Sequence, residues 1–297
     1  MNYRRSLALA ALTAGILCAQ QNDAPEYGPP VGTLLIVGGG NLAGTGIMET
    51  FINLAGGPAA KIIVVPTAGG NKDKDGKWIV YKEEQIIAPW VKLGATNVHM
   101  LHTHDRREAD TEAFANTLRD AKAVWFNGGR QWNCVDSYMN TLTTREFHDL
   151  LARGGIIGGS SAGATIQGDY LVRGAVAGPD IMMTPEPEHG FQFLRKSAID
   201  QHINTRNRWD DLLPVTMKYP SFLGIGLSEG TAIIVNQDRF EVMGKWKVAI
   251  WDNTHPRQPW EKPFFVLSAG DVYNMKTRTI EKYGIGNQTP VSVGAKQ

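Results

Sequence analysis

The chain has 297 residues and a formal net charge of +1, which gives no electrostatic reason to expect binding to nucleic acid or to an anionic membrane. A hydrophobic share of 42% and a charged share of 20% are typical of a globular protein with a large buried core. This length permits one large domain or two small ones.

The first residues are typical of a secretory signal peptide. Arg4 and Arg5 form a basic start, and Leu7 to Cys18 is an apolar stretch too short to span a bilayer comfortably. A small residue, Ala19, follows at the expected cleavage point. We therefore expect residues 1–19 to be removed and the protein to be secreted or periplasmic, without membrane attachment after cleavage.

The rest of the chain is expected to form one domain. Residues 20–31 are polar, contain two adjacent prolines and are typical of a linker, and residues 32–297 would form a single α/β domain. Once the signal peptide is cleaved, Cys134 is the one remaining cysteine, so no intramolecular disulfide can form. It lies in a helical pattern and is expected to be a packed thiol.

Apolar strands alternate with helical segments in the first half of the chain. Helical spacing predicts helices over 46–55, 78–93, 108–118, 131–142 and 144–152. Strands that are apolar along their whole length favour a parallel sheet with helices on both faces. Such strands are expected at 33–37, 61–65, 97–101, 121–126 and 155–157.

The second half changes character. It predicts extended segments at 199–204, 223–227 and 231–235, followed by a hairpin formed by 239–243 and 245–251. We expect a smaller, mixed portion folded onto the same sheet. Residues 179–190 and 251–262 are expected to be surface loops.

Three glycine-rich turns, at 38–40, 128–129 and 158–163, follow predicted strands, and ligands of parallel sheets bind at that edge. The third contains the pattern G-x-S-x-G between a strand and a helix, with Ser161 at its centre. Such a turn exposes the hydroxyl, and the next amide N–H, that of Ala162, begins a helix and favours an oxyanion. Ser161 is the candidate nucleophile, although this short pattern also fits a glycine–serine turn without chemistry.

A nucleophilic serine needs a base and an acceptor that orients the base. Among seven histidines, His202 lies where a strand end could point into a site, but a histidine satisfied within the core fits equally well. Glu229 follows another apolar strand and is the best acceptor, with Asp200 and Asp169 as the alternatives.

Four motifs together resemble the cyanophycinase family of serine peptidases, which also includes aspartyl dipeptidase. They occur in the family's order and lie within residues 33–250. The resemblance implies a flavodoxin-like, three-layer α/β sandwich related to class I glutamine amidotransferases, with a mostly parallel central sheet and additional C-terminal strands. The motifs are Gly128–Gln131, Gly159–Ala164, Asp200–His202 and Gly224–Ala232.

The resemblance also implies roles for individual residues. Ser161, His202 and Glu229 would form a catalytic triad, and the N–H groups of Gly129 and Ala162 would form the oxyanion hole. Hydrolysis would act on an amide bond at an aspartyl residue, including the β-linked Asp-Arg unit of cyanophycin, and would need no cofactor. Substrate-binding positions would be Gln131, Asp200, Gln201, Arg206 and Arg208.

The chain departs from cyanophycinase after His202, where residues 207–211 replace a run expected to contain glycine and arginine. Arg206 would suit a bidentate grip on a substrate carboxylate, but a solvated basic turn fits equally well. These departures leave the peptide or isopeptide substrate open. The sequence also does not decide between a monomer and a homodimer.

Other function classes fit less well. An α/β-hydrolase esterase expects the order serine, acid, histidine, whereas the order here is Ser161, His202, Glu229. A non-catalytic binding protein on the same fold would not need all three of these residues. A glutamine amidotransferase would carry a cysteine at position 161.

Two short patterns remain. Gly38-x-Gly40-x-x-Ala43 satisfies a relaxed dinucleotide-binding fingerprint, but no acidic residue follows the second strand to hold a ribose. His102 and His104 supply too few ligands for a metal site, so a solvated loop and no metal are expected.

Overall fold

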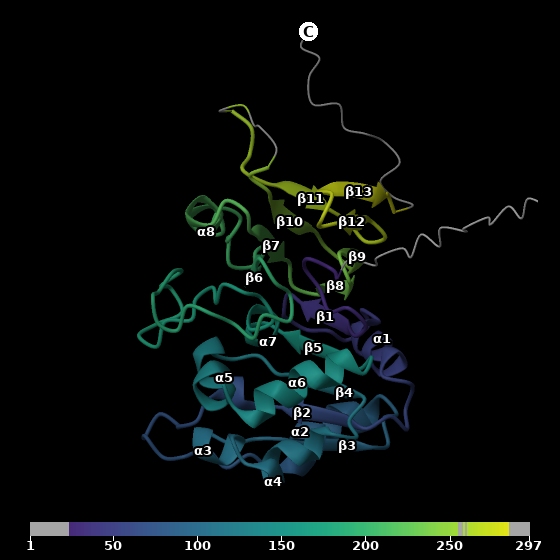
Figure 1. Ribbon diagram of the computed structural model, residues 1–297, viewed down its shortest axis with the longest axis vertical. Coiled ribbons are helices and arrows are strands. Elements are labelled where there is room, and N and C mark those ends of the chain that lie inside the picture. The colour runs from purple at the N-terminus through teal and green to yellow at the C-terminus, as the bar shows by residue number, and fades with distance from the viewer. Residues whose placement is uncertain (1–23, 255–257, 259, 285–297) are drawn as a thin grey trace, which may run out of the picture.

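The computed structural model describes residues 24–254, 258 and 260–284 (Figure 1). The predicted signal peptide, residues 1–19, lies outside the described residues, as does the start of the predicted linker. Among the described residues, none of the helices has the length and apolar character needed to cross a membrane.

The larger of two sheets has nine strands in the order β13-β12-β9-β8-β1-β5-β4-β2-β3. Its five N-terminal strands pair in parallel, and almost all of their residues are buried because both faces are covered. These strands are β1 (Thr33–Val37), β2 (Ile62–Val65), β3 (Val98–Met100), β4 (Ala123–Phe126) and β5 (Ile156–Ser160).

Helices cover both faces of this parallel part. Leu35 and Val37 pack in one core cluster with α1 (Ile47–Leu54) and with Trp90 of α2 (Glu83–Lys92). The alternate strand residues face a second cluster that includes side chains of α5 (Gln131–Tyr138), α6 (Leu142–Ala152) and α7 (Ala162–Thr165). The predicted three-layer α/β fold with a mostly parallel central sheet and extra C-terminal strands is therefore confirmed.

Four later strands extend this sheet in antiparallel fashion, beginning where β8 pairs with β1. The chain then forms β9, which pairs with both β8 and β12, and β13 lies at the edge. These strands are β8 (Thr231–Asn236), β9 (Arg239–Gly244), β12 (Val272–Asn274) and β13 (Thr279–Lys282).

The remaining strands form a separate sheet of four, in the order β11-β10-β7-β6, with the short helix α8 (Leu213–Lys218) beside β7. These strands form a second sheet rather than joining the first, but their side chains share one core cluster with it, as expected of a smaller, mixed portion folded onto that sheet. They are β6 (Ser197–Gln201), β7 (Leu223–Leu227), β10 (Val248–Trp251) and β11 (Phe265–Leu267).

The expected hairpin between 239–243 and 245–251 was wrong. β9 belongs to the large sheet, whereas β10 pairs with β7 and β11 in the smaller one. Gly244 has φ +104, and a side chain there would overlap the Gly230 carbonyl oxygen, so the chain turns away from β8 at this residue. All four residues of β10 are buried, as expected of a strand inside a second sheet.

Three predicted helices differ in extent, and the 131–142 helix ends at Tyr138. The 78–93 helix is shortened to α2, and Trp78 instead pairs with Lys72 in an isolated bridge. The 108–118 helix is divided into α3 (Arg106–Ala109), α4 (Glu112–Ala115) and a final 3₁₀ turn. The predicted helix is divided because Thr111 caps the start of α4: its hydroxyl accepts a hydrogen bond from the Phe114 N–H.

The described part of the predicted linker packs against the domain. Tyr27 is 2% exposed, and the Arg278 guanidinium lies over its ring. The Gly28 N–H donates to the Gln237 carbonyl, and the Arg195 side chain donates to the carbonyls of Pro25 and Gly28. Polar composition predicted a free segment here, whereas one aromatic side chain and main-chain hydrogen bonds hold it in place.

Candidate active site

A strained turn between β5 and α7 presents the predicted nucleophile. Ser161 has φ 57° and ψ −114°, a conformation that non-glycine residues rarely adopt outside functional turns. A side chain at Gly159 would overlap the Gly163 carbonyl oxygen, and one at Gly163 would overlap the Phe126 carbonyl oxygen. The turn therefore needs small residues around the serine, and the G-x-S-x-G pattern has a local steric cause.

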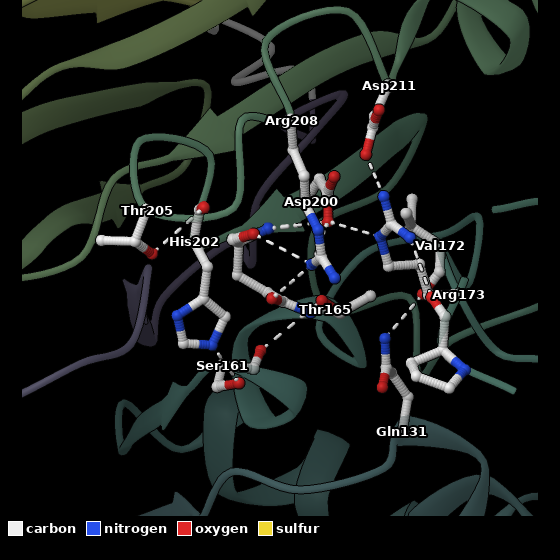
Figure 2. A network of polar contacts seen from close by, with 12 residues as sticks. Gln131, Ser161, Thr165, Val172, Arg173, Asp200, His202, Thr205, Arg208 and Asp211 are labelled. Carbon is white, nitrogen blue, oxygen red and sulfur yellow. Dashed lines mark hydrogen bonds and ion pairs between the residues drawn. The ribbon is translucent and has the colours of Figure 1, made fainter. Parts of the chain in front are cut away.

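The structure brings the three predicted triad side chains together in a chain of hydrogen bonds. The Ser161 and His202 side chains point toward each other (Figure 2). The Ser161 Oγ lies 2.7 Å from the His202 Nε2, and the His202 Nδ1 lies 2.5 Å from the Glu229 Oε1. A carboxylate can only accept, so the Nδ1 carries the proton. The Nε2 is then free to accept the proton of the Ser161 hydroxyl.

The glycine turn after β1 packs directly against the side chains of His202 and Glu229. Gly39 has φ +103, and a side chain there would overlap the His202 ring. A side chain at Gly40, with φ +77, would come within 2.6 Å of the Glu229 Oε2. These glycines, which match a relaxed dinucleotide fingerprint, are needed here because the triad lies directly against the backbone.

Short loops after β6 and β7 hold the base and its acceptor. His202 has φ 58° and its N–H donates to the Gly38 carbonyl at 3.0 Å. The Thr205 hydroxyl donates to the Glu229 Oε1 at 2.9 Å, and the Asn204 Oδ1 accepts the Glu229 N–H at 2.9 Å. The sequence patterns did not single out Asn204 and Thr205, although two hydrogen-bonding side chains two and three residues after a candidate histidine were a usable signal.

Burial and hydrogen bonding tune the two ionisable members. Burial is the main effect on His202 and lowers the pKa of its imidazole below the usual 6.5, against an opposing contribution from the hydrogen bond to Glu229. Burial alone would raise the pKa of Glu229, but hydrogen bonds from His202 and Thr205 outweigh it, so the net shift is downward. At neutral pH the site holds a neutral imidazole and a carboxylate, as a general base and its orienting group require.

The predicted oxyanion-hole residues, Gly129 and Ala162, lie in the turn after β4 and at the start of α7. A Cβ built on Gly128 would lie 3.1 Å from the Ser161 Cβ and 3.6 Å from its Oγ, so this turn passes directly beside the nucleophile. Within the described part of the chain, neither the Gly129 nor the Ala162 N–H donates a hydrogen bond to a protein group. Both amides are therefore available to a substrate oxygen.

Comparison with known proteins assigns the family. The family model for peptidase family S51 matches residues 34–243. The chain belongs to peptidase family S51. It is therefore a serine-type peptidase, a hydrolase whose substrate is a peptide.

Curated relatives of this S51 peptidase include two cyanophycinases. That of Geminocystis herdmanii (strain PCC 6308) is 26% identical over 264 residues, which cover 82% of this chain and 94% of that protein. That of Trichormus variabilis (strain ATCC 29413 / PCC 7937) is 28% identical over 268 residues, which cover 83% and 87%. A solved peptidase from an acI-B1 Actinobacterium shares the fold, with a TM-score of 0.60 at 22% identity over 82% of this chain and 97% of that chain.

Three of the predicted substrate-binding residues of this S51 peptidase lie in a buried ionic cluster (Figure 2). Asp200 is fully buried, 3.4 Å from the Arg173 Nε and 3.5 Å from the Arg208 Nη1. The Arg208 Nη1 also donates to the Gln201 carbonyl oxygen at 3.2 Å and to its Oε1 at 3.0 Å. In this arrangement Asp200, Gln201 and Arg208 contact one another, and Arg173, which also pairs with Asp211, was missed from the sequence.

The cluster is electrostatically unusual. Burial raises the pKa of Asp200 to about 6, against the opposing effect of the two guanidinium groups. The same burial lowers the pKa of Arg208, and the Asp200 carboxylate opposes that shift. The charges sit in a dry environment where each depends on its partners, which is typical of groups that fix a fold or position a neighbouring site.

The other predicted residues have separate surroundings. Gln131 is 3% exposed, and its side-chain amide donates to the Val172 carbonyl at 2.8 Å. Arg206 is exposed on the loop after His202 and contributes to lowering the pKa of that histidine. Asp169, an alternative acceptor, instead accepts from Gln192 and faces His189, so it does not serve His202.

Cys134 and the histidine pair lie outside this site. Cys134 is a buried free thiol, and burial raises its pKa to about 12, so it is a packed thiol as expected. His102 contacts the Thr67 hydroxyl, and His104 stacks on Trp78. No group of three or more metal-ligating side chains occurs among the described residues.

Proposed function

We propose that this S51 peptidase cleaves amide bonds at aspartyl residues with Ser161 as nucleophile, His202 as general base and Glu229 as the group that orients the imidazole. The observation that carries this proposal is the unbroken line of hydrogen bonds from the Ser161 Oγ to the Glu229 Oε1. The chemistry belongs to the serine-hydrolase class, in which a hydroxyl, an imidazole and a carboxylate act as one unit.

In the acylation step, the Ser161 oxygen forms a bond to the scissile carbonyl carbon, and its proton passes to the His202 Nε2. The carbonyl oxygen becomes an oxyanion, for which the N–H groups of Gly129 and Ala162 are the donors. Collapse of this intermediate breaks the C–N bond, and the Nε2 proton moves to the leaving amine. Water then repeats the sequence on the acyl-enzyme, with His202 again taking and returning the proton.

The aspartyl preference is supported by charge and by the relatives. Arg206 is the exposed cation on the loop that carries His202, and an exposed guanidinium can bind a carboxylate through two parallel hydrogen bonds. Cyanophycinases are among the relatives, so the β-linked Asp-Arg polymer cyanophycin is one of the aspartyl substrates to test. Arg208 is a poor candidate for direct contact because Asp200 and Gln201 already occupy its guanidinium.

The test is hydrolysis of cyanophycin and of α- and β-linked aspartyl dipeptides by purified protein and by Ser161→Ala. We expect products from at least one aspartyl substrate, and a loss of rate of about 10⁴-fold or more in the variant. Ser221→Ala is the control, because Ser221 is an exposed serine between α8 and β7 and has no hydrogen bond to His202 among the described contacts. Full activity in Ser161→Ala would refute the triad, and hydrolysis confined to peptides without aspartate would refute the substrate class.

We also propose that the protein is exported, on the basis of the basic and apolar N-terminal sequence. Mass spectrometry of the protein from a secreting host should find a mature N-terminus near residue 20. A chain retained in the cytoplasm with residues 1–19 intact would contradict this proposal.

A further inference from the structure

An apolar cavity lies directly beside the nucleophile and is not used by the triad. It has a volume of about 320 Å³, within the range of about 300–1,000 Å³ that is usual for small-molecule sites. Its walls come from the loop after β1 and from α1 and α2, and its inner end comes from the ends of β4 and β5. Its lining includes the apolar side chains of Leu42, Met48, Ile86 and Trp90, with Asn127, Gly128 and Ser160 at the strand ends.

The cavity adjoins the turn that carries Ser161, because Gly128 and Ser160 are among its lining residues. Gly128 belongs both to the cavity and to the turn that passes within van der Waals distance of Ser161. Side chains alternate along β5, and Gly158 faces Phe51 and Trp125 on the α1 side, so Ser160 points to that same side. A substrate whose carbonyl carbon lies at the Ser161 Oγ therefore has this cavity within reach of a neighbouring side chain.

The side chains that line the cavity favour an apolar substrate side chain over a charged one. Leu42, Met48 and Ile86 are partly exposed and present hydrocarbon or thioether surface, with the Trp90 indole behind them. No charged side chain lines the cavity within the described part of the chain. A charged side chain entering it would lose water without gaining a partner, whereas an apolar side chain would gain burial, and methionine adapts readily to different apolar shapes.

The two sides of the nucleophile therefore differ. The exposed cation Arg206 lies on the His202 loop, and no residue of that loop contributes to the cavity lining. We propose that the cavity is a specificity subsite for an apolar side chain, carried by the residue joined to the aspartyl residue at the scissile bond. This inference depends on the proposed function and adds to it: the preferred substrate pairs an aspartyl residue with a leucine-like or methionine-like one.

The wild-type protein tests this directly with Asp-Leu, Asp-Met, Asp-Ala and Asp-Arg dipeptides, each in α and β linkage. We expect kcat/KM for the leucine and methionine substrates to exceed that for alanine by about 10- to 100-fold, with arginine no better than alanine. Equal values across the panel, or a preference for arginine, would overturn the subsite while leaving the proposed function intact. Hydrolysis of none of the aspartyl substrates would overturn both.

Substitutions in the cavity wall test whether the cavity causes the preference for leucine over alanine. Ile86→Ser removes apolar surface from the cavity wall, and we expect the leucine-to-alanine ratio of kcat/KM to fall about tenfold. Val91→Ser is the matched control on the same helix, because Val91 is 55% exposed and lies outside the cavity; its ratio should equal that of the wild type.

A third variant guards against loss of folding in Ile86→Ser. Met48→Trp keeps the wall apolar but fills space, so it should reduce leucine hydrolysis more than alanine hydrolysis. An unchanged ratio in a folded Ile86→Ser or Met48→Trp protein, checked by its thermal midpoint, would overturn the assignment of the cavity.

Discussion

Two clusters of charged groups lie on either side of a single residue, Gln201, and they differ in accessibility. Asp200 is fully buried between two arginines, whereas Glu229, the partner of His202, keeps 30% of its side chain exposed. The strand ends at Gln201, and the left-handed backbone of His202 turns the chain toward Ser161. The Asp200 group is closed to solvent and the Glu229 group is partly open, so only the second is accessible to a substrate in the proposed function.

Of the variants that test this difference, Glu229→Gln is expected to reduce activity most, because it keeps the shape of the acceptor but removes its charge. The imidazole loses the carboxylate that orients it and stabilises its protonated form, so kcat should fall about 10³- to 10⁴-fold with little change in thermal midpoint. Steady-state kinetics on the best aspartyl substrate would measure this. A loss below about tenfold would show that Glu229 does not act on His202 in catalysis.

A substitution in the buried cluster around Asp200 should lower the free energy of unfolding. Arg208→Met leaves Asp200 with Arg173 alone in a dry site, and breaking such a pair costs about 3–5 kcal/mol of unfolding free energy. Arg239→Met is the control, because Arg239 pairs with Glu281 in an exposed bridge and should cost about 1 kcal/mol or less. Similar losses for both variants in urea unfolding would contradict the distinction between the clusters.

Arg206→Gln should have a smaller, substrate-dependent effect. If the exposed guanidinium binds a substrate carboxylate, KM for aspartyl substrates should rise about tenfold and kcat should change little. The unfolding free energy should not change, because the side chain is exposed. A fall in kcat without a rise in KM would assign Arg206 to the His202 environment instead.

The smallest expected effect is on the pH dependence of kcat/KM. His202 must be neutral to accept a proton, and burial lowers its pKa, so activity is lost only as pH falls below 6.5. The acid limb of kcat/KM should therefore have its midpoint below 6.5. In Glu229→Gln the limb should move lower still, because the bond to Glu229 raises the His202 pKa; movement to higher pH would contradict that coupling.

Much of the fold was predictable because it depends on local patterns. Fully apolar strands alternating with helical spacing led to the parallel part of the sheet, where both faces are buried. The smaller sheet was not predictable in this way. β9 and β10 are neighbours in the sequence with the same strand character, but β9 forms a local hairpin with β8, whereas β10 pairs with the more distant β7.

The candidate site shows the same limit. The pattern around Ser161 has a local steric cause, so the sequence alone pointed to it. Strand-end positions made His202 and Glu229 candidates, but only the resemblance joined them to Ser161 as one triad, since each comes from a different strand end. The sequence could not separate Asp200 and Arg208 from the residues that reach solvent, because burial of a charged pair depends on partners such as Arg173, distant in the chain.

The most direct test of the triad is covalent labelling with a fluorophosphonate, followed by peptide mapping. One adduct is predicted, on the oxygen of Ser161, and His202→Ala should react at least about 100-fold more slowly because the hydroxyl then has no base. An adduct on Ser160, or equal labelling of His202→Ala, would contradict the central claim that the hydroxyl of Ser161 is activated by the imidazole 2.7 Å away.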